Sequence, residues 1–289
     1  MGIGSLSAEK LPAGLYVLST PIGAAKDVTL HVLELLERLD VLVAEDTRVL
    51  RKLMDIHGVP LAGRPLKSFH DHSTEEDRDR ILDAIENGAS VGYASDAGTP
   101  LIADPGYGLI TGAHGRGLKV EVAPGASALT AALALAGQPT DKIYFGGFLP
   151  PKTTARKSAL NDIANLQASL VFYESPKRLI SSVRDMVEVF GTDRSITLCR
   201  ELTKKFQEVH KASLGDMAQY LQSKDSIKGE VVLVLGAPVH KQVSLEEVRK
   251  ELGVLMLEKG TKEASAILSE KYGLKRKQIY DFALTLKET

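Results

Sequence analysis

The chain has 289 residues, of which 44% are hydrophobic and 25% charged, and its formal net charge is -1. This length can bury the cores of two domains and a small appendage, and the near-zero charge excludes a protein that holds nucleic acid through a global positive field. A single cysteine, Cys199, excludes an internal disulfide and argues against a zinc site. Because no secretory signal or membrane-length apolar segment is found, we expect a cytoplasmic protein without a membrane partner.

Short apolar runs alternate with helical patterns along the chain. The runs predict strands buried on both faces at 15–18, 41–44, 91–94, 120–122, 170–173, 196–198 and 231–235. Between most of them lie helical patterns at 28–39, 74–85, 125–136 and 176–190. Ser175 before Pro176, and Asp104 before Pro105, each predict a helix N-cap followed by a first-turn proline. The alternation predicts an α/β protein with largely parallel sheets.

Three domains are predicted. An N-terminal α/β domain spans 13–138, a second α/β domain spans 139–238, and a helical tail spans 239–289. Two consecutive prolines within 148–152 predict a hinge or linker there, because neither fits inside a helix or a central strand. In the tail, two apolar stripes are separated by a stop at Gly273 and resemble a helix-turn-helix: Ala264, Ile267, Leu268 and Tyr272, then Ile279, Phe282, Ala283 and Leu286. A packing or dimerisation module is the alternative.

Four predicted strands end in turns rich in Gly, Pro and Ser. These turns are 20–23, 95–100, 124–128 and 173–176. Ligands of open α/β sheets sit at the carboxyl ends of strands, so we expect the turns to converge on a cleft. No glycine-rich dinucleotide or phosphate-binding loop occurs, which favours a ligand without a polyphosphate. An adenosine with an amino-acid tail would use backbone groups of 97–102, the Ser127 hydroxyl and apolar contacts.

Seven strings carry a family resemblance. In chain order they are 20–23, 45–48, 95–106, 124–128, 147–150, 173–178 and 200–204, and they resemble those of the bacterial 16S ribosomal RNA ribose 2'-O-methyltransferases of the tetrapyrrole methylase superfamily. The resemblance covers about residues 15–237, and the tail looks like that family's terminal module. It implies two α/β domains of the tetrapyrrole methylase type with S-adenosyl-L-methionine in the cleft between them, and a homodimer. It also implies methylation of a cytidine ribose in the decoding region of 16S rRNA in the small ribosomal subunit.

The resemblance further implies which residues contact the cofactor. Carried over position by position, they are Pro21, Ser95, Asp96, Ala97, Gly98, Thr99, Leu101, Ile102, Ser127, Ala128, Tyr173, Glu174, Leu202, Gly229 and Glu230.

Methyl transfer from a sulfonium needs no metal, but a positioned base can accelerate it roughly 10²- to 10⁴-fold. Glu45 and Asp46 follow a predicted strand, and His70 and His72 are further candidates for that base. We favour the Glu45–Arg48 turn, where a carboxylate would take the proton and Arg48 would hold a phosphate through a bidentate contact. Alternatively, Glu45 or Asp46 only caps a helix beginning near Thr47. A metal on the alternating histidines is not expected, because no third ligand is evident.

A basic stretch predicts the RNA contact. Residues 142–184 hold seven Lys and Arg but two acidic residues, a pattern that a solvated helical face would also explain. The predicted RNA-binding residues, which position the strand without reading its sequence, are His70, His72, Lys152, Arg156, Lys157, Lys177 and Arg178.

Two other functions compete with this prediction. A methyltransferase acting on a precorrin or uroporphyrinogen would use the same two-domain cleft, although the 45–48 string and the helical tail argue against it. A non-enzymatic nucleic-acid-binding regulator would act through the tail and use the α/β body as a scaffold.

Overall fold

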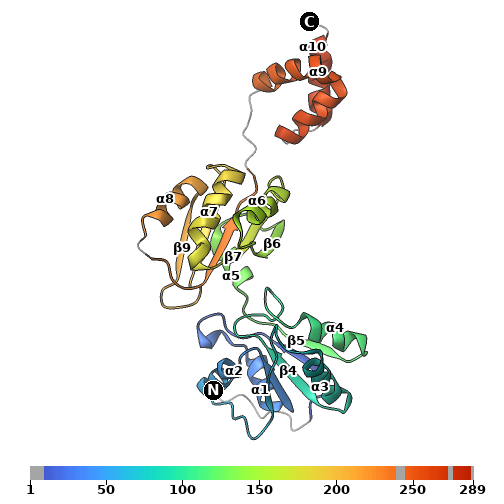
Figure 1. Ribbon diagram of the computed structural model, residues 1–289, viewed down its shortest axis with the longest axis vertical. Helices are drawn as coiled ribbons and strands as arrows, with labels where there is room; N and C mark the ends of the chain where they lie inside the picture. The colour runs from blue at the N-terminus through green and yellow to red at the C-terminus, as the bar shows by residue number, and fades with distance from the viewer. Residues whose placement is uncertain (1–9, 225, 239–244, 273–275, 288–289) are drawn as a thin grey trace. The chain divides into compact units, whose positions relative to one another are not determined.

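The computed structural model describes residues 10–224, 226–238, 245–272 and 276–287 (Figure 1). It divides into two compact units, 1–237 and 238–289. The first unit contains two five-stranded sheets, and in the second the described elements are helices. Within the described residues, no helix is both long and apolar enough to span a membrane.

The first sheet is entirely parallel, as the alternating pattern predicts. Its strands lie in the order β3-β2-β4-β1-β5 and are β1 (Gly14–Leu18), β2 (Val41–Ala44), β3 (Leu66–Ser68), β4 (Ser90–Ala94) and β5 (Val120–Ala123). Two buried clusters flank it, one with α1 (Leu30–Arg38) and α2 (Thr47–Ile56), the other with α3 (Glu75–Glu86) and α4 (Tyr107–Gly115). A 3₁₀ turn, η1 (Ala25–Asp27), precedes α1.

The register of this sheet aligns the loops that leave it. Ala94 at the end of β4 pairs with Leu18 of β1 and with Ala44 of β2. Leu18 also pairs with Ala123, the last residue of β5. The loops after these four strands therefore begin at one level on one edge of the sheet.

The second sheet is mixed, so the expectation of largely parallel sheets is wrong here. Its strands lie in the order β6-β7-β10-β8-β9 and are β6 (Ile143–Phe148), β7 (Ser169–Glu174), β8 (Ser195–Arg200), β9 (Glu208–Ser213) and β10 (Val231–Leu235). Only β6 and β7 are parallel to each other. The connection from β8 to β9, residues 201–207, is too short for the crossover that parallel neighbours require.

Helices cover both faces of the second sheet. Figure 1 shows α6 (Thr153–Asp162), α7 (Pro176–Phe190) and α8 (Leu214–Gln222) side by side over one face, which they bury in a common cluster. The other face packs against α5 (Ala128–Ala136), whose Ala132 and Ala136 contact the cluster containing Val171 and Val234. This helix contacts the second sheet although the predicted first domain, 13–138, includes it. The prolines of 148–152 join β6 to α6, so they do not separate the two sheets.

Helix starts test the predicted caps. The start of α7 at Pro176 after Ser175 is confirmed. The predicted start at Asp104–Pro105 is wrong, because α4 begins at Tyr107 and its N-cap is Gly106 with a φ of 118°. A Cβ on Gly106 would lie 2.5 Å from Tyr93 Cε1, so a left-handed glycine is required where the chain passes that ring.

The tail unit consists of α9 (Leu245–Tyr272) and α10 (Arg276–Lys287), with a non-helical Gly260 dividing α9 in two. The predicted stripe residues Ala264, Leu268, Ile279 and Ala283 are buried with Val248 and Leu252. Leu286, also assigned to a stripe, is 37% exposed. The helical character of the tail agrees with the prediction, although no apolar stripe was assigned before Gly260, and the expected stop at Gly273 lies outside the described residues.

Candidate active site

A cavity of about 350 Å³ lies within the first unit, between loops of the first sheet and strand ends of the second. We call it the donor cavity, and its walls are mainly apolar. Its lining comprises Ile22, Ala97, Gly98, Thr99, Ile102, Asp104, Ser127, Ala128, Phe148, Tyr173, Glu174, Ser175, Pro176, Gly229, Glu230, Val231 and Val232. A volume of this size with few polar groups is typical of small-molecule sites.

Three of the predicted turns are bonded to one another at this cavity. Thr20 and Gly98 exchange two backbone hydrogen bonds, with N···O distances of 2.8 and 3.0 Å. The hydroxyl of Thr99 donates to the carbonyl oxygen of Ala126 at 3.0 Å. The fourth turn joins them through Tyr173, which hydrogen-bonds Leu129 and Ser127 and whose pKa is raised by burial. The turns after β1, β4, β5 and β7 thus form one surface.

The backbone at Gly98 brings two of these turns into close approach. Its φ is 83°, and a Cβ there would lie 3.2 Å from Ile22 Cγ2. Leu101 and Ala103, with φ of 71° and 64°, continue the same loop in left-handed conformations. Non-glycine residues adopt such angles only where the surrounding structure holds them, so this loop is rigidly determined.

The predicted cofactor residues divide into two groups. Those that line the donor cavity are Ala97, Gly98, Thr99, Ile102, Ser127, Ala128, Tyr173, Glu174, Gly229 and Glu230, whereas Pro21, Ser95, Asp96, Leu101 and Leu202 are absent from its lining. Ser95 and Leu202 are buried behind the walls, where the Ser95 hydroxyl donates to the carbonyl oxygen of Gly98 and Leu202 packs in the cluster that contains Ile22 and Val232. Sequence reasoning missed Ile22, Asp104, Phe148, Ser175, Pro176, Val231 and Val232. Ile22 and Ser175–Pro176 lie in turns that had been singled out, but no sequence signal marks the strand-end apolar residues.

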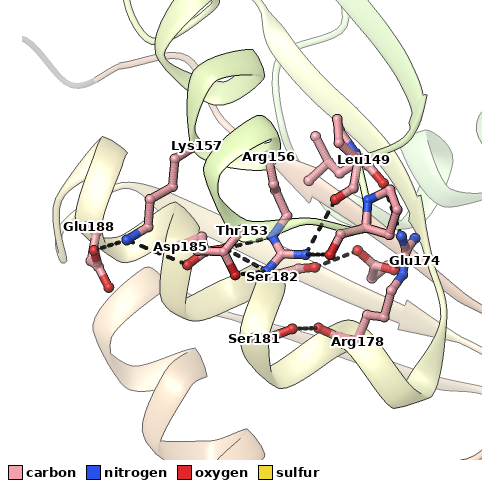
Figure 2. Close-up of polar contacts among 12 residues, drawn as sticks. Leu149, Thr153, Arg156, Lys157, Glu174, Arg178, Ser181, Ser182, Asp185 and Glu188 are labelled. Atoms are coloured by element: carbon pink, nitrogen blue, oxygen red, sulfur yellow. Dashed lines mark hydrogen bonds and ion pairs between the residues drawn. The ribbon is translucent and has the colours of Figure 1, made fainter.

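The side chain of Glu174 is occupied within the protein (Figure 2). Its carboxylate accepts the backbone N–H of Ser175 at 2.7 Å and the Ser182 hydroxyl at 2.5 Å, and pairs with Arg178 at 2.7 Å. The carboxylate therefore orders this strand end rather than offering a free acceptor.

The Glu45–Arg48 turn is organised by Asp46, which caps α2. Its carboxylate accepts the backbone N–H of Arg48 at 2.8 Å and pairs with the guanidinium at 2.5 Å. These contacts with Arg48 lower the pKa of Asp46 to about 2, so Asp46 is a weak base. The capping alternative is thus realised at Asp46. Burial and the nearby Asp96 charge raise the pKa of Glu45, although its carboxylate accepts the Asp96 backbone N–H at 3.3 Å.

A second cavity of about 250 Å³ adjoins the same loop, and we call it the acidic cavity. Its lining comprises Phe69, His70, Asp71, Ser73, Thr74, Glu75, Arg78, Asp104, Pro105, Gly106, Tyr107 and Gly108. His70 belongs to this lining and His72 does not, although their rings meet edge to face with centroids 6.0 Å apart. Among the described residues, no group of three or more His, Cys, Asp or Glu side chains could hold a metal ion.

The predicted RNA-binding cations have different environments. Lys152 and Lys177 are exposed, whereas Lys157 pairs with Glu188 and Arg178 pairs with Glu174 (Figure 2). The structure contradicts the prediction for Arg156, which is 2% exposed. Its Nε donates to Asp185 Oδ2 at 2.6 Å, and its Nη1 donates to the carbonyl oxygens of Pro150 and Pro151. A buried guanidinium with these partners cannot reach an RNA phosphate.

Comparison with known proteins identifies the family. The Tetrapyrrole (Corrin/Porphyrin) Methylases match residues 14–218, and the RsmI C-terminal HTH domain matches residues 242–287. Ribosomal RNA small subunit methyltransferase I of Mesorhizobium japonicum is 37% identical over 289 residues, covering 100% of this chain and 97% of that protein. The chain belongs to this methyltransferase family. The Escherichia coli O157:H7 member is 36% identical, covering 96% of this chain and 97% of that protein.

Solved structures show the same fold at lower identity. The methyltransferase CobJ aligns with a TM-score of 0.60 at 20% identity, covering 80% of this chain and 97% of that one. A uroporphyrin-III C-methyltransferase from Thermus thermophilus, complexed with S-adenyl homocysteine, aligns with a TM-score of 0.54 at 18% identity, covering 78% and 98%. The tetrapyrrole methylase fold predicted for this family member is confirmed.

Proposed function

We propose that this chain transfers a methyl group from S-adenosyl-L-methionine to the ribose 2'-hydroxyl of a cytidine in the decoding region of 16S rRNA. The observation that carries the proposal is the donor cavity, where four strand-end turns converge on residues that the family resemblance assigns to the methyl donor. Full-length relatives named ribosomal RNA small subunit methyltransferase I support an RNA substrate.

The residues present fit such a donor. Ile22, Ile102 and Val232 offer apolar contacts to an adenine ring, and Ser127 offers a hydroxyl. Gly98 lets the loop approach the turn that carries Ile22, so both contribute to one wall of the cavity. The bound donor supplies an activated methyl group on a positively charged sulfur.

The protein's own contribution is positioning. Holding the attacking oxygen in line with the methyl group contributes up to about 7–11 kcal/mol through orientation alone. The rigid loop of residues 95–106 and the capped start of α2 lie at the same sheet edge, where they can orient the two reactants. Exposed Lys152 and Lys177 are suited to positioning phosphates. We further propose a cytoplasmic homodimer that acts on the small ribosomal subunit or its rRNA.

Incubation with labelled methyl donor and small ribosomal subunits tests the proposal. We expect label on a ribose of the rRNA, detected as a linkage resistant to alkaline hydrolysis. Label on a precorrin or uroporphyrinogen alone would favour the tetrapyrrole alternative, and label on neither would reject methyl transfer to these substrates.

A cavity-filling variant ties the label to the donor cavity. Ala128 is the first residue of α5 and lines that cavity, so Ala128→Leu should weaken donor binding by about 1–3 kcal/mol in calorimetry. Ala134→Leu makes the same change at an exposed position of the same helix, outside the cavity lining, and serves as the matched control. Equal affinities in the two variants would place the donor elsewhere.

A further inference from the structure

Among the residues that the structure describes, Asp104 is shared by the linings of the donor cavity and the acidic cavity. It lies in the irregular loop between β4 and α4, two residues before the N-cap Gly106, and its side chain is partly buried. A side chain that lines both cavities can contact two molecules at once, the donor in one cavity and a second molecule in the other. It therefore lies where the two molecules would meet. Neither Asp46 nor His72 lines either cavity.

We propose that Asp104 is the catalytic base that accepts the proton of the target ribose hydroxyl, and that the acidic cavity receives the target nucleoside. This inference rests on the function proposed above. In the step, the oxygen–methyl bond forms as the methyl–sulfur bond breaks, and the sulfur leaves as an uncharged thioether. The hydroxyl proton moves to a carboxylate oxygen of Asp104.

The surroundings of Asp104 suit a base at neutral pH. Burial and the Glu45 charge raise the pKa of Asp104 to about 6, although a hydrogen bond from Ser95 lowers it. General bases work best when their pKa lies near the operating pH. Asp46, with a pKa of about 2 and a bidentate arginine, is far less basic. The other titratable or charged groups around Asp104 come from the loops and from the linings of both cavities, and they are Glu45, Asp71, Asp96, Tyr93, His70, Glu75, Arg78, Tyr107, Tyr173, Glu174 and Glu230.

A buried hydroxyl lies behind the wall of the acidic cavity. Tyr93 is fully buried, and its hydroxyl has no hydrogen-bond partner among the described residues. Its ring packs edge to face on Phe69, which lines the cavity, with centroids 6.1 Å apart. A Cβ built on Gly106, another lining residue, would lie 3.1 Å from the Tyr93 hydroxyl oxygen. Tyr93 does not itself line the cavity, and buried polar groups are nearly always satisfied, so a water behind this wall is the expected partner of the hydroxyl.

The composition of the acidic cavity favours the neutral part of a nucleotide. Asp71, Glu75 and Asp104 present carboxylates, which accept hydrogen bonds from sugar hydroxyls and from an exocyclic amine such as that of cytosine. These three carboxylates outnumber the single arginine of the lining, Arg78, so the cavity favours the sugar and base over the phosphates.

Asp104→Asn tests the assignment, because the amide keeps the shape of the side chain and cannot take the proton. We expect donor affinity in calorimetry to be retained and ribose methylation of small subunits to fall by roughly 10²- to 10⁴-fold. Asp162→Asn makes the same change at an exposed carboxylate that ends α6 and lines neither cavity, and it should keep the wild-type rate. A rate for Asp104→Asn equal to that of Asp162→Asn, or a loss of its donor binding, would overturn the assignment.

The pH profile separates Asp104 from its neighbour Glu45. The wild-type methylation rate should rise as pH increases through about 6 and then level off. Asp104→Glu should keep this rising limb of the pH profile at a reduced rate. Glu45→Gln removes a charge that raises the pKa of Asp104, so the rising limb of the pH profile should persist in this variant and move to lower pH. A limb that disappears in Glu45→Gln would identify Glu45 as the base. If the wild type places no label on ribose, the proposed function itself fails and Asp104 loses its role with it.

Discussion

The carboxylate of Asp96 accepts a hydrogen bond from the backbone N–H of Asp46 at 2.9 Å, while the backbone N–H of Asp96 donates to Glu45 at 3.3 Å. The loop after β4 therefore holds the turn after β2 in place. Because β2 and β4 end in register at Ala44 and Ala94, both loops leave the sheet at the level where this contact can form.

Asp96→Ala should loosen the Glu45–Arg48 turn. We expect a lower methylation rate with donor affinity close to wild type, because the side chain bonds the turn and is absent from the donor-cavity lining. Calorimetry with the donor and a methylation assay on the same preparation check this. A large loss of donor affinity would instead support the contact that the family resemblance assigns to Asp96.

Arg156→Met should destabilise the protein without a direct effect on RNA binding. Removing Arg156 leaves the buried Asp185 carboxylate with only its longer contact to Lys157 at 3.8 Å, and breaking a buried pair of this kind costs up to about 3–5 kcal/mol in the free energy of unfolding. Chemical denaturation measures this cost. Lys152→Met, at an exposed position of the same segment, should leave stability nearly unchanged and weaken RNA binding. Weaker RNA binding by a fully folded Arg156→Met protein would restore the original prediction for Arg156.

The raised pKa of Asp104 predicts a pH-dependent effect on stability. Between about pH 4, where the unfolded carboxyl titrates, and about 6, where the folded one does, the folded state binds more protons. As pH rises through this window, the free energy of unfolding of the wild type should therefore fall relative to that of Asp104→Asn. At higher pH the difference between the two proteins should stay constant. Thermal unfolding of both proteins at pH 4, 5, 6 and 8 provides the comparison, and a difference independent of pH would contradict the raised pKa.

Gly106→Ala should destabilise the first unit. The new Cβ would lie 2.5 Å from the Tyr93 ring on a backbone with φ of 118°, and strain of this kind costs about 1–3 kcal/mol. Gly108→Ala is the matched control, because it lies inside α4 with no atom within 4 Å of its new Cβ. The control should be neutral or stabilising by about 0.4–1 kcal/mol in thermal unfolding. Equal melting temperatures for the two variants would show that the loop relaxes.

Four of the five strands of the first sheet could be predicted, because its central strands are continuous apolar runs, the pattern of strands buried on both faces. The short strand β3, Leu66–Ser68, was not predicted, since it contains a single apolar residue. The polar strand β9, Glu208–Ser213, lacks that pattern, since its residues are only partly buried or exposed. Apolar runs also carry no information on strand direction, which is why the antiparallel pairing of β8 and β10 was missed. Direction depends on the length and path of the connections.

The site was predictable where it depends on turn chemistry and not where it depends on cavity shape. Glycine, proline and serine mark the turns at Thr20, Ser95 and Pro124, and the structure brings these turns together. Asp104 was interpreted as a helix cap because Asp-Pro is a common helix start. The position of Asp104 between two cavities depends on the contact between Gly106 and Tyr93. Neither residue stands out in the sequence, and nothing in the sequence marks that contact.

The three contacts that immobilise the Glu174 carboxylate also bear on how a ligand meets this protein. They join the end of β7 to the start of α7, so the wall formed by residues 173–176 is held by the protein's own side chains without a ligand in the donor cavity. An arriving molecule then loses little affinity to ordering of the backbone around it. Recognition on that side is a matter of complementary shape, and the residues that secure it lie on the helix behind the wall.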